Sequence, residues 1–396
     1  MGAPLEGIHV LDLSRILAGP FATMILADLG AEVIKVEAPG RGDDTRSWGP
    51  PFIEGESTYF MSVNRTKLGI SLDFKHPRGR EILFRLLDRS DVVIENFRTG
   101  ALKRQGLGYD ALAGKYARLI YCSISGYGHT GPRSAEPGFD AMIQGESGLM
   151  SVTGSPDGPP SKVGASVADI VAGMYAVQGI LAALYQRAET GRGQHIDVAL
   201  LDSMVSALNY QAAIYFTTGR TPQRMGNRHP SIAPYETFEA ADGYFTLGVT
   251  TDPHWHRFCR ALQFSDLEED PRYASVAERV RNYESLRRSL AAALRQRPAA
   301  FWLQRLREAG IPCGEVRTVS QALEDPQLAA RDMILELPHP KAGPIRVLGS
   351  PIRMSASAPM RPTPPPTLGQ HNREVLCGIL GLSEAEYENL ARERVI

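Results

Sequence analysis

Residues 8–37 read IHVLDLSRILAGPFATMILADLGAEVIKVE, and this stretch indicates the class of the fold. The run IHVLDL at 8–13 is short, apolar and bounded by polar residues, which is typical of a buried strand. GPFATMILADLG at 19–30 has the apolar spacing of a helix, and EVIKVE at 32–37 returns to a strand pattern. Strand, helix and strand in this order predict a βαβ unit.

The same alternation continues through the first 200 residues. Further strands are predicted at 91–96, 119–124 and 195–200, and further helices at 78–89, 169–187 and 201–215. The helix 169–187 has a small side chain at every third or fourth position, so a neighbouring backbone can approach it closely. Successive βα rounds favour a mainly parallel sheet with helices on both faces. The predicted fold class is therefore α/β.

The length and local composition predict two domains. The chain has 396 residues, more than the ~250 to 300 at which single cores stop growing. Residues 217–234 are rich in Gly, Pro, Arg and Asn and are interpreted as a linker. Residues 235–338 combine a strand pair with helical patterns and predict a small α+β domain. The proline-rich residues 358–366 predict an extended spacer.

The composition limits the partners. Lys and Arg number 43 and Asp and Glu number 44, so the net charge is -1 and no chain-wide field attracts nucleic acid or an anionic membrane. The apolar runs are interpreted as shorter than the ~20 residues of a membrane span. The four cysteines form no CxxC pair and lie beside no histidine at ligand spacing. We therefore expect reduced thiols, a cytoplasmic location and no metal site.

Cationic residues follow several of the predicted strands, near the edge where a parallel sheet binds its ligands. As a group they suit a polyphosphate, whereas any single one is better interpreted as a solvated surface charge. The residues concerned are Arg41, Arg46, Arg65, Lys67, Lys75, Arg98 and Arg104.

Asp169 lies at the beginning of the long predicted helix, and two interpretations stay open. A first-turn carboxylate stabilises the helix macrodipole. Alternatively, a carboxylate between apolar and small residues can act as a nucleophile that the helix N-terminus keeps ionised. No GxGxxG motif follows the first strand and no GxSxG motif occurs, so neither a nicotinamide site nor a serine hydrolase is indicated.

Seven segments, in order and over nearly the whole chain, resemble the class III CoA-transferase family, also called the CaiB/BaiF family. This family includes formyl-CoA transferases, carnitine CoA-transferases and α-methylacyl-CoA racemases. The resembling segments are LDLSRILAGPFATMILADLGAEVIKVE, NRTKLGISLD, VIENFRTGAL, SISGYGHTGPRSAEPGFD, GILAALYQRAETGRGQHIDVALLDS, GIPCGEV and LGQHNREVL.

The resemblance implies a fold with more detail than the patterns supply. A large Rossmann-like domain would be built from residues 1–216 and 339–396, with the smaller domain 235–338 between them. Two chains would be threaded through each other as an interlocked homodimer. The linker and the proline-rich segment would then be the connectors of an open ring.

The resemblance also implies a chemical role for Asp169, which matches the family's catalytic aspartate. Its carboxylate would attack a donor thioester to form a mixed anhydride, and the released CoA would convert this anhydride into an aspartyl-CoA thioester. An acceptor acid would then take the CoA by the reverse steps. Water must be excluded, because both intermediates hydrolyse.

For the CoA thioester, which is a substrate and not a bound cofactor, the family pattern implies a set of contacts on several loops. Leu17 stands where formyl-CoA transferases have glutamine, and their tetraglycine loop is missing near LGVTTD, so formyl-CoA and oxalate are not favoured. The implied CoA-binding residues are Arg15, Ala18, Leu72, Lys75, Asn96, Phe97, Arg98 and Arg104.

The choice between transferase and racemase depends on residues 138–140. Racemases of the family resemble GHD there and use the histidine as an acid/base, whereas this chain has GFD, and Phe139 transfers no proton. Asp140 either assists Asp169 or has a structural hydrogen-bonding role. The resemblance thus favours a CoA-transferase, with a racemase or a non-catalytic CoA-ester binding protein as alternatives.

The segment MGNRHPSIAPYETF resembles members that use succinyl-CoA and dicarboxylic acids. Its cations Arg224, Arg228 and His229 could bind the distal carboxylate of an acceptor. The alternative is a linker whose charges only keep it solvated. We expect succinyl-CoA, or a similar acyl-CoA, as the donor and a dicarboxylic acid as the acceptor.

Overall fold

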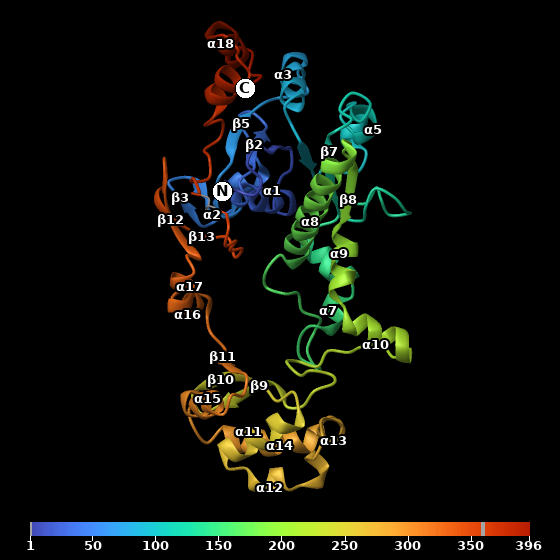
Figure 1. Ribbon diagram of the computed structural model, residues 1–396, viewed down its shortest axis with the longest axis vertical. Coiled ribbons are helices and arrows are strands. Elements are labelled where there is room, and N and C mark those ends of the chain that lie inside the picture. The colour runs from blue at the N-terminus through green and yellow to red at the C-terminus, as the bar shows by residue number, and fades with distance from the viewer. Residues whose placement is uncertain (1, 358–360) are drawn as a thin grey trace. The chain divides into compact units, whose positions relative to one another are not determined.

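The structure is a computed structural model that describes residues 2–357 and 361–396 (Figure 1). It divides into two compact units. The first comprises Met1–Leu149, Val163–Tyr210 and Gln327–Ile396, and the second comprises Met150–Lys162 and Gln211–Pro326. The predicted spacer 358–366 lies partly outside the described residues, because 358–360 are not among them.

The first unit is built on a six-stranded sheet in the order β5-β2-β1-β6-β7-β8, with every neighbouring pair parallel. This confirms the predicted α/β class with a parallel sheet. The strands are β1 (His9–Asp12), β2 (Glu32–Glu37), β5 (Leu68–Ser71), β6 (Val92–Glu95), β7 (Ile120–Ser125) and β8 (His195–Ala199).

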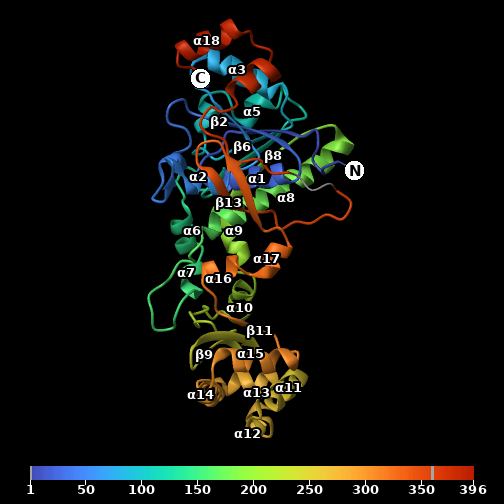
Figure 2. The ribbon, with the colours of Figure 1, turned by 90° about the vertical axis from the view of Figure 1, so that its left-hand side faces the viewer.

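Alternating side chains of these strands enter two separate cores, one on each face of the sheet. On β1, Val10 belongs to the core with α1 and α8, and Leu11 to the core with α3 and the C-terminal segment. Helices α3 and α18 lie side by side in both views (Figures 1 and 2). The helices named here are α1 (Ala18–Asp28), α3 (Pro77–Leu87), α8 (Val167–Thr190) and α18 (Glu384–Arg392).

The close approach of α1 and α8 depends on small residues. Ala172, Ala176 and Ala183 are buried as predicted. The tightest point is Gly173, where an added Cβ would lie 2.8 Å from the carbonyl oxygen of Ala18. The backbone of α8 is therefore pressed against the beginning of α1.

Helix α8 is also long and apolar enough to cross a membrane by length and composition alone. The interpretation that all apolar runs are too short for a span is thus wrong for Val167–Thr190. One such helix is weak support for a membrane protein, because core helices pass the same test. Here α8 contributes to a core shared with α1 and β7.

Strand β5 forms one edge of the sheet, and the returning C-terminal segment covers it with side chains. Gly69 N donates to His371 Nδ1 at 3.0 Å, and Ser71 N donates to Asn372 Oδ1 at 2.8 Å. The outward backbone groups of β5 are thereby occupied without another strand.

The remaining elements of the first unit are short. A hairpin pairs β12 (Ile334–His339) with β13 (Gly343–Leu348), and β3 (Phe52–Ile53) pairs with β4 (Glu56–Ser57). The others are η1 (Asp44–Ser47), α2 (Thr58–Ser62), α4 (Ala101–Arg104), α5 (Tyr109–Leu112), α6 (Asp140–Glu146), α9 (Leu200–Ala207) and the π-helix η3 (Glu374–Ile379).

The second unit packs helices on a three-stranded antiparallel sheet, as an α+β domain should. Its core contains Trp255, Phe258 and Trp302. Its elements are β9 (Tyr235–Ala240), β10 (Gly243–Gly248), β11 (Cys313–Glu315), α11 (Asp252–Leu262), α12 (Ser265–Glu268), η2 (Pro271–Tyr273), α13 (Val276–Arg281), α14 (Tyr283–Leu294), α15 (Ala299–Glu308) and α16 (Val319–Leu323).

The bounds of this unit differ from the predicted 235–338. It also takes in residues 150–162 and 211–234, and residues 327–338 group with the first unit because β12 pairs with β13 there. Three helices cross the borders between the units: α7 (Leu149–Val152), α10 (Tyr210–Thr218) and α17 (Pro326–Ala330). The predicted helix 201–215 is divided near Asn209, whose φ is +43°.

Candidate active site

The candidate site lies where the order of strands reverses. After β1 the chain builds β2 and β5 on one side, and then returns to place β6, β7 and β8 on the other. Ligands of open parallel sheets bind outside the carboxyl ends of the strands at such a point. The loops after β1 and β6 are joined there, since Arg15 N donates to Asn96 Oδ1 at 2.8 Å and Asn96 Nδ2 donates to Arg15 O at 2.6 Å.

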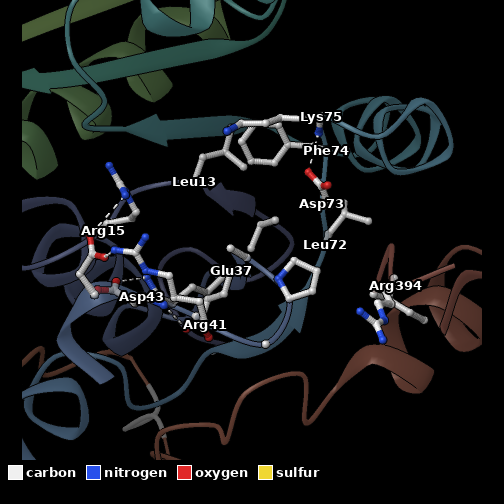
Figure 3. Close-up of a pocket in the computed structure, with 18 of the residues that line it drawn as sticks. Leu13, Arg15, Glu37, Arg41, Asp43, Leu72, Asp73, Phe74, Lys75 and Arg394 are labelled. Carbon is white, nitrogen blue, oxygen red and sulfur yellow. Dashed lines mark hydrogen bonds and ion pairs between the residues drawn. The ribbon is translucent and has the colours of Figure 1, made fainter. Parts of the chain in front are cut away.

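The larger cavity of this region has a volume of about 710 Å³ (Figure 3). Phe74 and Phe97 form an edge-on aromatic pair in its wall, with ring centroids 6.4 Å apart. Lys75 and Arg394 also line it, and neither forms an ion pair within the described residues. Apolar walls with free cations suit a nucleotide that bears phosphates. The predicted CoA-binding residues that line it are Arg15, Leu72, Lys75 and Phe97.

A smaller cavity, of about 180 Å³, contains Asp169. Arg15 and Phe97 line both cavities, so these two residues connect them. The smaller cavity also brings together four other predicted site residues, which are Ala18, Asn96, Arg98 and Phe139. Arg104 lines neither cavity.

Asp169 is half-buried in the first turn of α8, and its carboxylate forms no hydrogen bond or ion pair within the described part of the chain. Burial and the negative charge of Asp140 raise the pKa of Asp169 to about 7. We expected the helix N-terminus to keep this group ionised, and here the structure differs. Burial and a like charge disfavour the anion, so the ionised form of Asp169 is not stabilised.

Asp140 is held by hydrogen bonds to both of its oxygens. Ala168 N donates to Oδ1 at 2.9 Å, and Gln144 Nε2 donates to Oδ2 at 2.8 Å. The first bond satisfies an N-terminal amide of α8, as a capping side chain does. Asp140 therefore positions the helix turn that bears Asp169.

A network of buried charges lies beneath the loop after β1. Lys35 Nζ donates to Asp43 Oδ2 at 2.9 Å and to Ser14 O at 3.0 Å. Lys67 Nζ donates to Asp12 Oδ2 at 3.1 Å and to Pro20 O at 2.9 Å. Lys35 thus fixes a backbone carbonyl of the loop, and Lys67 fixes one in the first turn of α1. Burial lowers the pKa of Lys67 to about 8.

This network corrects the predicted polyphosphate cluster. Lys67 and Arg65 are buried, and Arg65 pairs with Asp28 instead of facing a ligand. Arg46 binds both oxygens of Glu37, at 2.6 and 2.7 Å. These three cations hold the fold together, and their carboxylate partners neutralise them.

The same loop contains a strained residue. Ile16 has a φ of +71°, a region that a β-branched residue rarely adopts. Its N–H donates to both oxygens of Asp43, each at 3.2 Å. The buried carboxylate thus holds the turn that leads into Leu17 and Ala18, both of which line the Asp169 cavity.

In the second unit, Arg224 and Arg228 line one cavity of about 880 Å³. The Arg228 guanidinium lies over the ring of Tyr283, 3.5 Å from its centroid, and its nearest carboxylate oxygen, on Glu284, is 4.0 Å away. Arg224 donates to Ser155 O at 3.2 Å and Gly158 O at 2.9 Å. His229 is not among the residues described as lining this cavity, and its ring packs on Tyr235.

Sequence reasoning missed Phe74 and Arg394 in the larger cavity, and Tyr59 near Asp169. Burial and then the charge of Asp169 raise the pKa of the Tyr59 phenol, which also bonds to Ser166. Phe74 could have been predicted from the sequence, because it directly precedes Lys75, which the family pattern implies as a CoA contact. No local signal marks Tyr59 or Arg394, since each reaches the site from a distant part of the chain.

The fold and this site define a class of α/β protein with a nucleotide-sized cavity beside a second cavity that contains a half-buried carboxylate. The family model of CoA-transferase family III matches residues 5–372, and the chain belongs to this family. In the described residues no group of His, Cys, Asp and Glu side chains is arranged to hold a metal ion.

Two curated relatives and one solved structure agree with this assignment. Succinyl-CoA:glutarate CoA-transferase of Mus musculus is 43% identical over 393 residues, which cover 99% of this chain and 90% of the relative. Succinyl-CoA:mesaconate CoA-transferase of Haloarcula hispanica is 40% identical over 386 residues, which cover 95% of this chain and 96% of the relative. The solved structure of a CaiB/BaiF family protein from Brucella suis is 43% identical and has a TM-score of 0.85. The match covers 96% of this chain and 100% of that protein's chain.

Proposed function

We propose that this CoA-transferase moves CoA from succinyl-CoA to a dicarboxylic acid through a covalent intermediate on Asp169. The observation that carries the proposal is a carboxylate with a raised pKa and no partner, in a cavity that shares Arg15 and Phe97 with a nucleotide-sized cavity. The larger cavity would take the nucleotide of CoA, and the smaller one the acyl end. The relatives described above act on succinyl-CoA and dicarboxylates, which supports this choice of substrates.

The reaction would run in four balanced steps. An Asp169 oxygen attacks the succinyl carbonyl and expels CoA thiolate, which leaves a mixed anhydride. The thiolate attacks the Asp169 carbonyl, releases succinate and forms an aspartyl-CoA thioester. The acceptor carboxylate then attacks this thioester and again expels the thiolate. Finally the thiolate attacks the acceptor's acyl carbon, which frees Asp169 and gives the new thioester.

Asp140 would act in this reaction through its position and charge. Its bond to Ala168 N fixes the first turn of α8, and its charge raises the pKa of Asp169. A less stabilised carboxylate is the stronger nucleophile once it is ionised. Phe139 is 54% exposed and lines the Asp169 cavity, and we propose that it contacts the acyl group.

Intact-mass analysis after incubation with succinyl-CoA tests the covalent step. We expect a CoA adduct that maps to Asp169 and disappears when glutarate or another acceptor is added. Asp169→Ala should form no adduct and should remain folded. Turnover without any adduct, or α-deuterium uptake from heavy water into a branched acyl-CoA without an acceptor, would contradict the proposal and favour the racemase.

We also propose that Arg224 and Arg228 recognise the acceptor's second carboxylate. Neither guanidinium has a carboxylate within hydrogen-bond distance among the described residues, and both line one cavity. Arg228→Gln should raise KM for glutarate at least tenfold, because a charge-assisted bond is lost, and should leave KM for a monocarboxylic acid of equal length unchanged. The exposed Arg257→Gln on α11 is the matched control.

We propose a homodimer as the working assembly. Several large apolar side chains of α8 and α9 are exposed in the first unit, including Tyr185 at 74%, and a second copy of the chain would cover them. The others are Met174, Tyr175 and Val205. Light scattering should give about twice the mass of one chain, and a monomer at micromolar concentration would contradict this.

A further inference from the structure

A buried polar cluster that the proposed reaction does not use lies directly behind the loop after β6. Glu95 is the last residue of β6 and is only 4% exposed. Its Oε2 accepts a hydrogen bond from the backbone N–H of Phe97 at 2.8 Å. Ser123, which is fully buried on β7, lies close enough to favour the charged form of this carboxylate. Glu95 is thus tied to the backbone of the residue that lines both cavities.

Two histidines complete the cluster. His129 Nε2 lies 4.0 Å from Glu95 Oε1 and is buried without a hydrogen-bond partner in the described structure. His195 Nε2 is 3.0 Å from Ser123 Oγ, and its ring stacks on Tyr109 at 5.3 Å. Although Ser123, His195 and Glu95 resemble the residue types of a hydrolase triad, the Ser123 hydroxyl is sealed in the core and cannot reach a substrate.

We propose that Glu95 is a positioning residue that orients the loop of Asn96, Phe97 and Arg98 toward CoA. The proposal rests on the proposed function only in taking this loop as part of the CoA site. Hydrogen bonds hold this loop at two residues that line the Asp169 cavity: Asn96 is bonded to Arg15, and the N–H of Phe97 is bonded to Glu95.

The charge of Glu95 decides how firmly it holds Phe97 N–H, because a carboxylate accepts a stronger hydrogen bond than a carboxylic acid. Burial raises the pKa of Glu95, which brings its loss of charge closer to neutral pH. Ser123, the backbone N–H of Phe97 and His129 favour the anion, and the charge of Asp197 opposes it. Burial, and then the charge of Glu95, raise the pKa of Tyr121 and of Cys122, so both groups stay neutral.

Calorimetric titration with CoA itself tests the proposal without any turnover. Glu95→Ala should weaken the Kd for CoA roughly ten- to a hundredfold, which is the effect of losing a hydrogen bond to a charged group. Glu95→Gln keeps an oxygen that can accept from Phe97 N–H but lacks the charge, so at pH 8 its Kd should be weaker than that of wild type by less than in Glu95→Ala. Glu32→Ala, at an exposed carboxylate on the opposite end of the sheet, is the matched control.

The pH dependence separates positioning from a purely structural role. In the wild type the Kd for CoA should weaken as pH falls and Glu95 takes up its proton, beyond any weakening seen in Glu95→Gln. The Gln variant thereby subtracts the titration of the CoA phosphates.

Three results would overturn the inference: an unchanged Kd in Glu95→Ala, equal pH profiles for wild type and Glu95→Gln, or equal weakening in the Ala and Gln variants. If Glu95→Ala fails to fold, the comparison of wild type with Glu95→Gln still decides. Failure of the proposed function is distinguishable, because it would be seen as a missing CoA adduct on Asp169 in the wild type, whereas the Kd for CoA is measured without any turnover.

Discussion

Asp12 and Asp169 are two carboxylates of the first unit that burial affects in opposite ways. Burial alone would raise the pKa of Asp12, but Lys67 and Lys35 outweigh it and hold that pKa below its ordinary value. Asp169 has no cation beside it among the described residues, and burial together with Asp140 raises its pKa to about 7. The comparison teaches that the supply of partners, and not burial, separates a carboxylate that supports the fold from one that is free to react.

The largest expected effect tests whether Asp169 is the reactive member of this pair. Asp169→Asn should lower kcat by at least about a thousandfold, because an amide cannot form the anhydride. It should also stabilise the fold. Since the folded-state pKa is raised, wild-type stability falls from about pH 4 to pH 7, and the gain from the neutral Asn should reach about 1 to 3 kcal/mol at pH 8.

Urea unfolding at pH 5 and pH 8, together with steady-state rates, measures both effects. A variant that loses activity and stability together would show that Asp169 supports the fold, as Asp12 does.

The second prediction concerns the partnered carboxylate. Asp12→Asn should destabilise the first unit by about 3 kcal/mol, because it leaves the buried ammonium of Lys67 without its counter-charge. Urea unfolding at pH 7 measures this. Exchange of the exposed Glu32 for Gln should change the free energy of unfolding by less than about 0.5 kcal/mol. An Asp12→Asn protein as stable as wild type would show that the pairing of Asp12 with Lys67 does not support the fold.

The third prediction tests the close contact between α8, which bears Asp169, and the beginning of α1. In Gly173→Ala the new methyl group would lie 2.8 Å from Ala18 O, so α1 and α8 must separate. We expect a loss of about 1 to 3 kcal/mol and a several-fold lower kcat, because Ala18 lines the Asp169 cavity. In Gly114→Ala the added Cβ meets nothing within 4 Å, and this variant should behave as wild type.

The smallest expected effect is a shift in pH profile. Only ionised Asp169 attacks, so kcat/KM of the wild type should rise with pH through about 7. Asp140→Asn removes a like charge, which lowers the pKa of Asp169 and moves this rise to lower pH by up to about one unit. Glu146→Gln, at the other end of α6 from Asp140, should leave the pH profile unchanged. A shift to higher pH in Asp140→Asn would contradict the assigned electrostatics.

The parallel sheet and most of the site could be predicted from local patterns and from the family resemblance. The strands and helices of 8–37 follow from apolar spacing within a few residues, and Asp169, Arg15 and Phe97 lie in the cavities as the resemblance implies. Asp140 shows where prediction stopped, because only the coordinates identify Ala168 N and Gln144 as its partners.

Other features could not be predicted, because they depend on contacts between distant segments. Lys67 and Arg65 have the pattern of surface cations until Asp12 and Asp28 are brought beside them from 55 and 37 residues away. Residues 150–162 join the second unit through contacts such as Gly226 N to Gly154 O, at 3.0 Å. No local periodicity records such pairings.

The covering of β5 by His371 and Asn372 has a consequence for handling the protein. An open strand edge offers free N–H and C=O groups to any other extended chain and so promotes intermolecular pairing. Here two side chains occupy those positions. A protein shortened before residue 371 would therefore be expected to aggregate during expression, even though every strand of its main sheet would remain.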